Sequence, residues 1–472
     1  MIQGNRQRFS SLAIFLLVAG LCACARAGGA DYAVVVSDKT NADPQWHAVV
    51  EVLREKHHAS VLTFGKSVAE SLPKLRAQFP RYACFVATPA EATREFVVQV
   101  HRLTRRLDDD PYTDCIWGIL TGYDAANALR IAKQTEPLVI RKGAGGTAIA
   151  LDKFEEGVWF DEGRQGHMMR KERGGEPKEQ TAPDDTTAAI VKEFNSGNVD
   201  FFLTSGHATE RDWQIGFSYR NGQFRCADGR LFGLDTQNVH HPIDSPNPKV
   251  YLPVGNCLMG HIDGPDAMAL AFMNSGGVDQ MVGYVVETWY GYGGWGVLDY
   301  FVKQPGRFTL AESFYANQQA LIFRLATYFP ELLDAEIDER GRTKARPLLT
   351  DKARKAGVKA QDAIGLLFDR DFVAFYGDPA WEARLAPRDC EWEQTLTGKD
   401  GVFTFEVKPK PGSDGLAHLD RPIFQLLPQR LKHIKLLEGA ELQPTITNKF
   451  LLLPNAKDAG KPLRIVFRAE KA

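Results

Sequence analysis

The sequence predicts an α/β fold followed by a small β-rich C-terminal domain, and three observations lead to this prediction. From Asp31 onward, short apolar runs typical of buried strands alternate with amphipathic runs typical of helices. The alternation stops in a charged, glycine-rich stretch over 157–185 and then resumes. After about Pro387 only strand-like runs separated by turn residues remain. Such an order is typical of a parallel sheet with helices on both faces, followed by a β-sandwich-like domain.

The expected elements follow one another in a regular order. In the first half, strands are expected at 32–37, 59–64, 82–88 and 115–120, and helices at 44–57, 68–79 and 90–107. In the second half, strands are expected at 199–205, 249–255 and 278–285, and helices at 186–197, 265–277, 297–303 and 310–328. Pro265 opens one of these helices and glycines close it, as is usual at helix ends. A last short strand and a turn are expected within 369–379.

We divide the chain where the pattern of expected strands and helices changes. The four segments are 1–24, an expected secretory signal; 31–140, an N-terminal α/β subdomain; 141–387, a second α/β subdomain; and 388–472, a β-sandwich-like C-terminal domain. The length of the chain, 472 residues, also favours more than one domain.

The N-terminus is typical of a secretory signal. Arg6 and Arg8 precede the apolar run LAIFLLVAGLCACA, which is too short for a confident membrane span. Two processing sites are possible at the end of this run. LCAC places Cys24 where a bacterial lipoprotein carries its lipid, and residues 25–27, ARA, form an ordinary small-x-small cleavage site. We therefore expect an extracytoplasmic protein, in the periplasm, secreted, or held at the outer membrane only through an N-terminal lipid anchor.

The amino-acid composition limits the classes of binding partner that we expect. The chain is 44% hydrophobic and 25% charged, which is typical of globular proteins. Its 57 Lys and Arg against 59 Asp and Glu give a net charge of −2, so the basic excess of a nucleic-acid binder is missing. A protein or peptide substrate is the expected partner. Five cysteines lie outside the signal, an odd number, so at least one thiol is expected to be free.

Two reactive side chains follow two of the expected strands. The run VDFFLTSGH ends in His207, and KVYLPVGNC ends in Cys257. Ligands and catalytic groups in open α/β sheets gather beyond the carboxyl ends of strands. A His beside a Cys is sufficient for acyl transfer, because the imidazole takes the thiol proton and the thiolate attacks a carbonyl. The pair is therefore a candidate catalytic dyad.

The order of motifs resembles the gingipain-like cysteine peptidases of the caspase-type superfamily. The family pattern of Gly-His-Gly, then Ser and Glu, then Trp is similar to GHATE followed by Trp213, and its Cys-x-x-Gly is similar to CLMG at 257–260. Farther on, DAMALAFMNSGGVDQMVGYVVETW and FYGDPAWEARL are similar to later family segments, and DDDPYTDCIWGILTGYDAANAL is similar to an earlier one. The resemblance covers roughly 31–385. It departs from the family at Ala208, where Gly is usual, and at Asn256, where a smaller residue is common.

The resemblance implies a caspase-like α/β/α sandwich in two unequal halves and a cysteine endopeptidase. His207 and Cys257 would be the dyad, and backbone N–H groups of Ala208 and Cys257 would form the oxyanion hole. Trp289 would line the pocket for the side chain before the scissile bond. Glu287 lies two residues earlier, on the same side if both are in a strand. A carboxylate beside an aromatic wall suits a cationic side chain, so cleavage after Arg or Lys is expected.

Several alternatives stay open at this stage. A third carboxylate that orients His207 can come from Glu155, Asp161 or Glu162. No cofactor is expected, although Asp108 to Asp110 could hold a structural calcium ion. A zinc site could be built from Cys257 and His261, which are four residues apart, with Cys226, His240 and His241, but it lacks paired ligand spacing. GYGGWG at 291–296 matches a dinucleotide fingerprint only formally. The rival of a different class is a catalytically inactive caspase-like module that binds partners at the cell surface.

Overall fold

The structure is a computed structural model that describes residues 31–412, 416, 419, 421–454 and 461–472. The expected signal segment and Cys24 lie outside the described residues. Within these residues, no helix combines the length and the apolar character that crossing a membrane requires.

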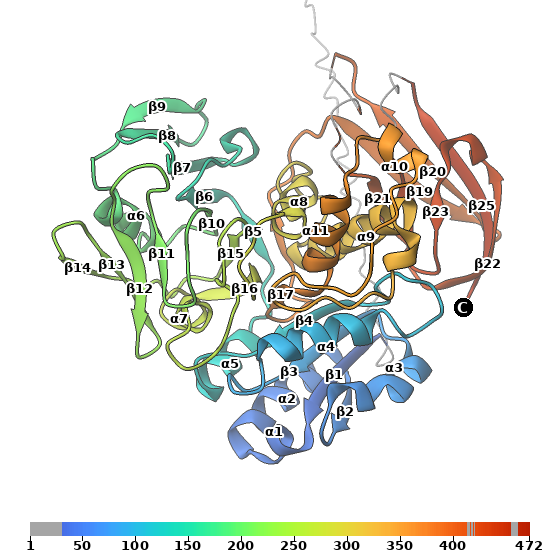
Figure 1. Ribbon diagram of the computed structural model, residues 1–472, viewed down its shortest axis with the longest axis horizontal. Helices are drawn as coiled ribbons and strands as arrows, with labels where there is room; N and C mark the ends of the chain where they lie inside the picture. Colours follow the sequence, from blue (N-terminus) through green and yellow to red (C-terminus); the bar gives the residue numbers. More distant parts are fainter. Residues whose placement is uncertain (1–30, 413–415, 417–418, 420, 455–460) are drawn as a thin grey trace, which may run out of the picture.

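One mixed sheet of twelve strands runs through the protein (Figure 1). In order across the sheet, the strands are β2 (Ser60–Phe64), β1 (Tyr32–Ser37), β3 (Tyr82–Val86), β4 (Ile116–Leu120), β17 (Val373–Tyr376), β16 (Val278–Tyr284), β15 (Lys249–Pro253), β10 (Phe201–Thr204), β6 (Lys142–Gly145), β7 (Glu156–Phe160), β8 (His167–Lys171) and β9 (Lys178–Thr181). The expected α/β class is confirmed, whereas a caspase-like topology stays a prediction. Strands from both expected halves pair through β17, which is parallel to β4 and antiparallel to β16.

The strands form where the sequence is continuously apolar. Every residue of β1, β4, β10, β15 and β16 is buried, because helices cover both faces of this part of the sheet. The helices are α1 (Asp38–Ala42), α2 (Pro44–His57), α3 (Leu72–Gln78), α4 (Arg94–Thr104), α5 (Ala125–Ala132), α6 (Thr187–Phe194), α7 (Met268–Asn274), α8 (Tyr292–Phe301), α9 (Leu310–Tyr328), α10 (Asp351–Lys355) and α11 (Ala360–Asp371). The charged stretch 157–185 departs from the alternation because it forms β8 and β9, antiparallel strands at the edge of the sheet.

Helix α9 lies between the sheet and the C-terminal strands. It begins with a capping box in which Thr309 and Glu312 bond each other's backbone N–H groups. Phe314 contacts Phe375 of β17 at a ring distance of 5.6 Å, and the neighbouring Tyr315 contacts Phe424 at 6.0 Å. Apolar partners on opposite sides explain why most of this helix is buried.

The C-terminal region is β-rich, as expected. One sheet orders β19 (Trp392–Lys399), β20 (Val402–Pro409), β25 (Leu463–Lys471) and β22 (Leu431–Glu438), and another orders β21 (Ile423–Leu426), β24 (Phe450–Leu453) and β23 (Thr445–Ile446). Successive side chains of strand β24 point alternately into two hydrophobic cores. Leu451 and Leu453 pack inside the C-terminal region, whereas Phe450 and Leu452 pack against the main core.

Two smaller sheets complete the described fold. One contains β11 (Asp212–Gln214), β12 (Gln223–Ala227), β13 (Arg230–Leu234) and β14 (His240–Pro242), and it follows directly after the His207 loop. The other pairs β5 (Leu138–Ile140) with β18 (Ala383–Leu385). Neither sheet has long apolar runs, which is why the sequence pattern does not predict them.

A buried carboxylate ties the end of β17 to the N-terminal elements. Asp378 accepts a hydrogen bond from the Tyr32 hydroxyl at 2.8 Å, and Lys56 Nζ lies 2.9 Å from it. His57 Nε2 lies 2.7 Å from the same carboxylate. Asp378 is therefore the common partner of β1 and α2.

Candidate active site

The loops that follow β10 and β15 lie side by side. The two strands are parallel neighbours, and Thr204 at the end of one pairs with Pro253 at the end of the other. The buried Asn256 side chain accepts a hydrogen bond from Thr204 Oγ1 at 2.6 Å and donates one to the Gly206 carbonyl at 2.9 Å. Asn256 immediately precedes Cys257, and Gly206 immediately precedes His207. The residue that looked like a departure from the family pattern thus joins the two loops.

The His207 loop turns away from the sheet at Gly206. This glycine has φ +92°, a conformation that residues with a side chain rarely adopt. His207 is exposed, and its ring stacks on the ring of Phe217 at 4.9 Å. Trp213 Nε1 donates to the Ser205 carbonyl at 2.9 Å, and Gln214 N donates to the His207 carbonyl at 2.9 Å. The loop is therefore held by strand β11 rather than by the main sheet.

Ala208 forms an isolated antiparallel bridge with Trp213. The hydrogen bonds that flank this bridge use the His207 carbonyl and the Thr209 N–H, and neither uses the Ala208 N–H. The methyl group at this position fits the bridge. Ala208 as an oxyanion-hole donor stays a prediction.

The Cys257 loop runs along the chain that follows β16. Leu258 N donates to the Val286 carbonyl at 3.0 Å, and Cys257 Sγ lies 3.7 Å from the Thr288 carbonyl. Leu258 has φ +58°, which is uncommon for a bulky residue. Strained backbone of this kind gathers at functional sites, because surrounding structure is needed to hold it. The sequence gives no signal for this strain.

The surroundings of the Cys257 thiol favour its protonated form. Burial raises the pKa of Cys257, and the negative charge of Glu287 raises it further. Among the hydrogen bonds of the described residues, none joins the Cys257 and His207 side chains. Catalytic hydrogen bonds are often long before substrate binds. Catalysis by these two side chains stays a prediction.

Of the three candidate acids, the structure brings Glu162 to the His207 loop. Glu155 forms ion pairs with Arg141 and Arg173. Asp161 binds His167 Nδ1 at 2.7 Å. Glu162 instead lies so close to Gly206 that a Cβ built there would be 3.4 Å from Glu162 Oε2.

The Glu162 carboxylate has one satisfied oxygen and one buried oxygen without a hydrogen-bond partner. Oε1 accepts from Thr147 Oγ1 at 2.9 Å, whereas Oε2 has no partner. Burial raises the pKa of Glu162. Its backbone carbonyl accepts from Phe217 N at 2.7 Å, so the same residue also positions the ring that stacks on His207.

Glu287 and Trp289 do not lie in a strand. Strand β16 ends at Tyr284, and both residues lie in the following loop, where the backbone has left the sheet to bond the Cys257 loop. Both side chains are exposed, so Trp289 is not a core residue. Its ring lies 6.3 Å from the ring of Phe368. The strand rule for side-chain direction therefore does not apply to this pair.

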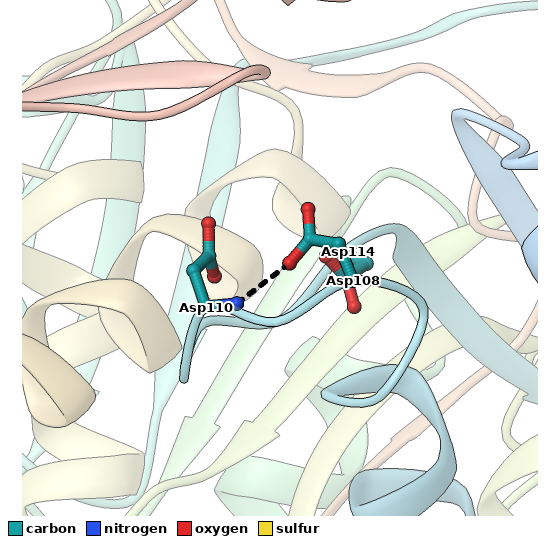
Figure 2. A group of neighbouring side chains, drawn as sticks. All are labelled: Asp108, Asp110 and Asp114. Carbon is teal, nitrogen blue, oxygen red and sulfur yellow. Dashed lines mark hydrogen bonds between the residues drawn. The ribbon is translucent and has the colours of Figure 1, made fainter.

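Three aspartates form the acidic cluster shown in Figure 2. The carboxylates of Asp108, Asp110 and Asp114 lie within 4.8 Å of one another. Asp108 accepts from the Asp110 backbone N–H at 3.0 Å, and Asp114 accepts from Leu107 N at 2.7 Å. Burial and the charge of Asp108 raise the pKa of Asp114 to about 8. The sequence pointed to Asp108–Asp110 but missed Asp114, and calcium at this cluster stays a prediction.

The residues of the other two alternatives are engaged elsewhere. Cys226 Sγ lies 3.0 Å from the Asp266 carbonyl, and His241 Nε2 lies 2.9 Å from Asp235, so these two side chains have separate partners. In GYGGWG, the N–H groups of Gly293 and Gly294 donate to Asp369 and to the Tyr284 hydroxyl. Hydrogen bonds within the protein thus occupy two of the backbone N–H groups that could otherwise bind a dinucleotide phosphate.

Comparisons with known proteins do not show a family for this chain. No family model matches the chain, and no curated protein matches it. Among solved structures, a chain described as "Structure of Protease" aligns with a TM-score of 0.43 and 9% identity, covering 94% of this chain and 96% of that one. A second, "Complex of Porphyromonas gingivalis RgpB pro- and mature domains", aligns with a TM-score of 0.42 and 10% identity, covering 93% and 98%. TM-scores below 0.5 do not establish a shared fold.

Proposed function

We propose that this protein is a cysteine endopeptidase in which Cys257 is the nucleophile and His207 the general base. The observation that carries the proposal is the Asn256 side chain, which hydrogen-bonds the residue before His207 from the position before Cys257. The proposal is also supported by the positions of Cys257 and His207 on adjoining loops, which follow the carboxyl ends of parallel strands, where reactive groups of α/β sheets gather. The strained Leu258 and the exposed His207 ring are in accord with a functional loop pair.

The reaction follows from these two groups. The His207 imidazole takes the proton of the Cys257 thiol, and the thiolate attacks the carbonyl carbon of the peptide bond. The C–N bond then breaks, and the imidazolium returns the proton to the departing amine. Water, deprotonated by His207, attacks the thioester and releases the acid, which restores the thiol. We propose the N–H groups of Ala208 and Cys257 as donors to the oxyanion.

Glu162 is proposed as the residue that positions His207. Glu162→Gln should lower kcat about 10²-fold with little change in KM, because the charge beside the His207 loop is lost while the shape is kept. Steady-state kinetics with one peptide substrate would measure this split, and Glu162→Asp should recover part of the loss. The neighbouring Asp161→Asn is the control and should keep full kcat. An unchanged kcat in Glu162→Gln, or a loss confined to KM, would contradict the assignment.

Alkylation of cysteines distinguishes the proposed enzyme from the rival hypothesis, a catalytically inactive binding module. Iodoacetamide should modify Cys257 faster than Cys226 and Cys390, the other two partly exposed thiols among the described residues, and His207→Ala should remove that advantage. Peptide mapping after brief exposure measures the rate at each thiol. Equal rates at all three sites, with and without His207, would favour the non-catalytic module.

The proposal also covers the location of the protein and its class of substrate. The features of the first 27 residues support action outside the cytoplasm, either free or through a lipid on Cys24. Peptides or proteins are the proposed substrates. The prediction of cleavage after Arg or Lys depends on Glu287, whose side chain is exposed in the loop after β16.

A further inference from the structure

A cavity of about 300 Å³ lies where the N-terminal α/β elements meet the C-terminal β-rich region. Its wall includes Arg81, which precedes β3, and Lys449, which precedes β24. Arg81 Nη1 donates a hydrogen bond to the Leu427 carbonyl at 3.1 Å, and Lys449 Nζ donates one to the Pro80 carbonyl at 2.6 Å. Two side-chain hydrogen bonds thus cross the junction in opposite directions and hold two cations at the cavity.

The side chains around this cavity carry an excess of positive charge. Arg430 and Lys471 line it together with Arg81 and Lys449, and Asp31 is the one carboxylate side chain of the wall. In the described part of the chain, none of these charged side chains takes part in an ion pair within 4 Å. Because charged groups that leave bulk water are normally paired, an anion is the ligand that these cations favour.

Two of the cations lie over one buried ring. The Arg430 guanidinium carbon lies 3.6 Å from the centre of the Phe79 ring, and Lys449 Nζ lies 4.6 Å from it. Phe79 ends α3 with φ +48°, which is uncommon for a bulky residue. The ring attracts both cations through its quadrupole but does not neutralise them. Phe79 therefore brings two like charges together and leaves both able to bind an anion.

The electrostatic surroundings of Lys449 also favour an anion. Burial lowers the pKa of Lys449 to about 8, and the positive charges of Arg81 and Arg430 contribute to the decrease. A negative charge on Asp114 would oppose the decrease, but burial raises the pKa of Asp114 itself to about 8. This carboxyl is therefore mainly protonated at pH 7 and supplies little negative charge. An anion in the cavity would stabilise the charged form of Lys449.

Tyr315 provides a neutral donor in the same wall. Its side chain is 3% exposed, and among the described residues its hydroxyl has no hydrogen-bond partner. The ring contacts Phe424 at 6.0 Å and Phe450 at 6.3 Å, so its position is fixed by packing. A buried hydroxyl without a partner lowers stability, and an oxyanion in the cavity is a suitable acceptor for it.

We propose that this cavity binds a small phosphate monoester. Such a ligand carries almost two negative charges at neutral pH and three acceptor oxygens, which suits several cations and the Tyr315 hydroxyl. The volume also accommodates a small organic group, which Leu427 and Ile116 of the wall can contact. The chain before Asp31 does not supply the anion, because residues 1–30 contain no Asp or Glu. None of the cavity residues belongs to the two loops of the candidate dyad, so the proposal does not depend on peptidase activity.

Calorimetric titration of the full chain with phenyl phosphate, at pH 7 and constant ionic strength, measures the binding. The expected Kd is below about 1 mM. Lys449→Gln and Arg430→Gln should each weaken binding at least about tenfold, because each removes a charge-assisted contact. Arg430 is exposed, so its variant should fold like the wild type. Lys399→Gln, at an exposed lysine of β19 outside the cavity, is the matched control and should bind like the wild type. No binding at about 10 mM, or an unchanged Kd in Arg430→Gln, would overturn the proposal.

Competition with phenyl phosphate tests the chemical class of the ligand. Phenyl sulfate carries a single negative charge and should bind at least about fivefold more weakly. Vesicles of phosphatidylcholine with phosphatidic acid should not displace phenyl phosphate, because the buried Tyr315 hydroxyl is out of reach of a headgroup at a bilayer surface. Equal or tighter binding of phenyl sulfate would overturn the choice of phosphate. Displacement by the vesicles would assign the site to a membrane surface and overturn the small ligand.

Discussion

Cys257→Ala should reduce peptide hydrolysis to about 10⁻⁴ of the wild-type kcat or less, without lowering the thermal midpoint of unfolding. The loss is large because the proposed thioester forms on the Cys257 sulfur. The fold should survive because Cys257 is only partly buried and, among the hydrogen bonds of the described residues, its sulfur makes one, at 3.7 Å to the Thr288 carbonyl. Hydrolysis of a fluorogenic peptide and thermal melting, measured on the same preparations, test both parts.

Cys226→Ala is the matched control for this prediction. Cys226 is also a partly exposed thiol, and burial raises its pKa to about 11. It lies against the Asp266 carbonyl rather than on the Cys257 loop. The Cys226 variant should keep full activity. Wild-type turnover by Cys257→Ala would exclude Cys257 as the nucleophile, and equal losses in both variants would point to a defect of folding.

Asp378→Asn should lower the free energy of unfolding by about 3–5 kcal/mol. The substitution leaves Lys56 and His57 beside a buried site without the carboxylate that both contact. It also weakens the link between β17 and β1 through Tyr32. Denaturant unfolding of the two proteins at pH 7 measures the difference. The exposed pair Asp389–Lys410 provides a control, since Asp389→Asn should change stability by about 1 kcal/mol at most.

The effect of Asp378 should depend on pH in a defined direction. Burial alone would raise the pKa of Asp378, but the charges of Lys56 and His57 outweigh it and hold the pKa well below its usual range. A carboxyl with a lowered folded pKa stabilises the protein above its unfolded pKa of about 3.9. The stability difference between wild type and Asp378→Asn should therefore be full above about pH 5 and shrink as the pH falls below about 4. A difference that does not change between pH 7 and pH 3 would contradict this account.

Local pattern was enough to predict much of the α/β region. Apolar runs and amphipathic stretches predicted strands close to β1, β3, β4, β10, β15 and β16 and helices close to α2, α4 and α9. The same runs placed His207 after one strand and Cys257 after another. These features depend on residues close together in the chain, because a buried strand needs a continuous apolar run and a surface helix needs an apolar stripe.

The sequence by itself therefore determined the elements and the reactive side chains at their ends, whereas only the tertiary structure decided which of them meet. Pairing of β10 with β15 brings Asn256 onto Gly206, and the turn at Gly206 brings Glu162, rather than Glu155 or Asp161, to the His207 loop. The position of Glu287 outside a strand also depends on contacts with the Cys257 loop. Such contacts join residues far apart in the chain, and their formation depends on the packing of the whole sheet, which no local pattern of residue types encodes.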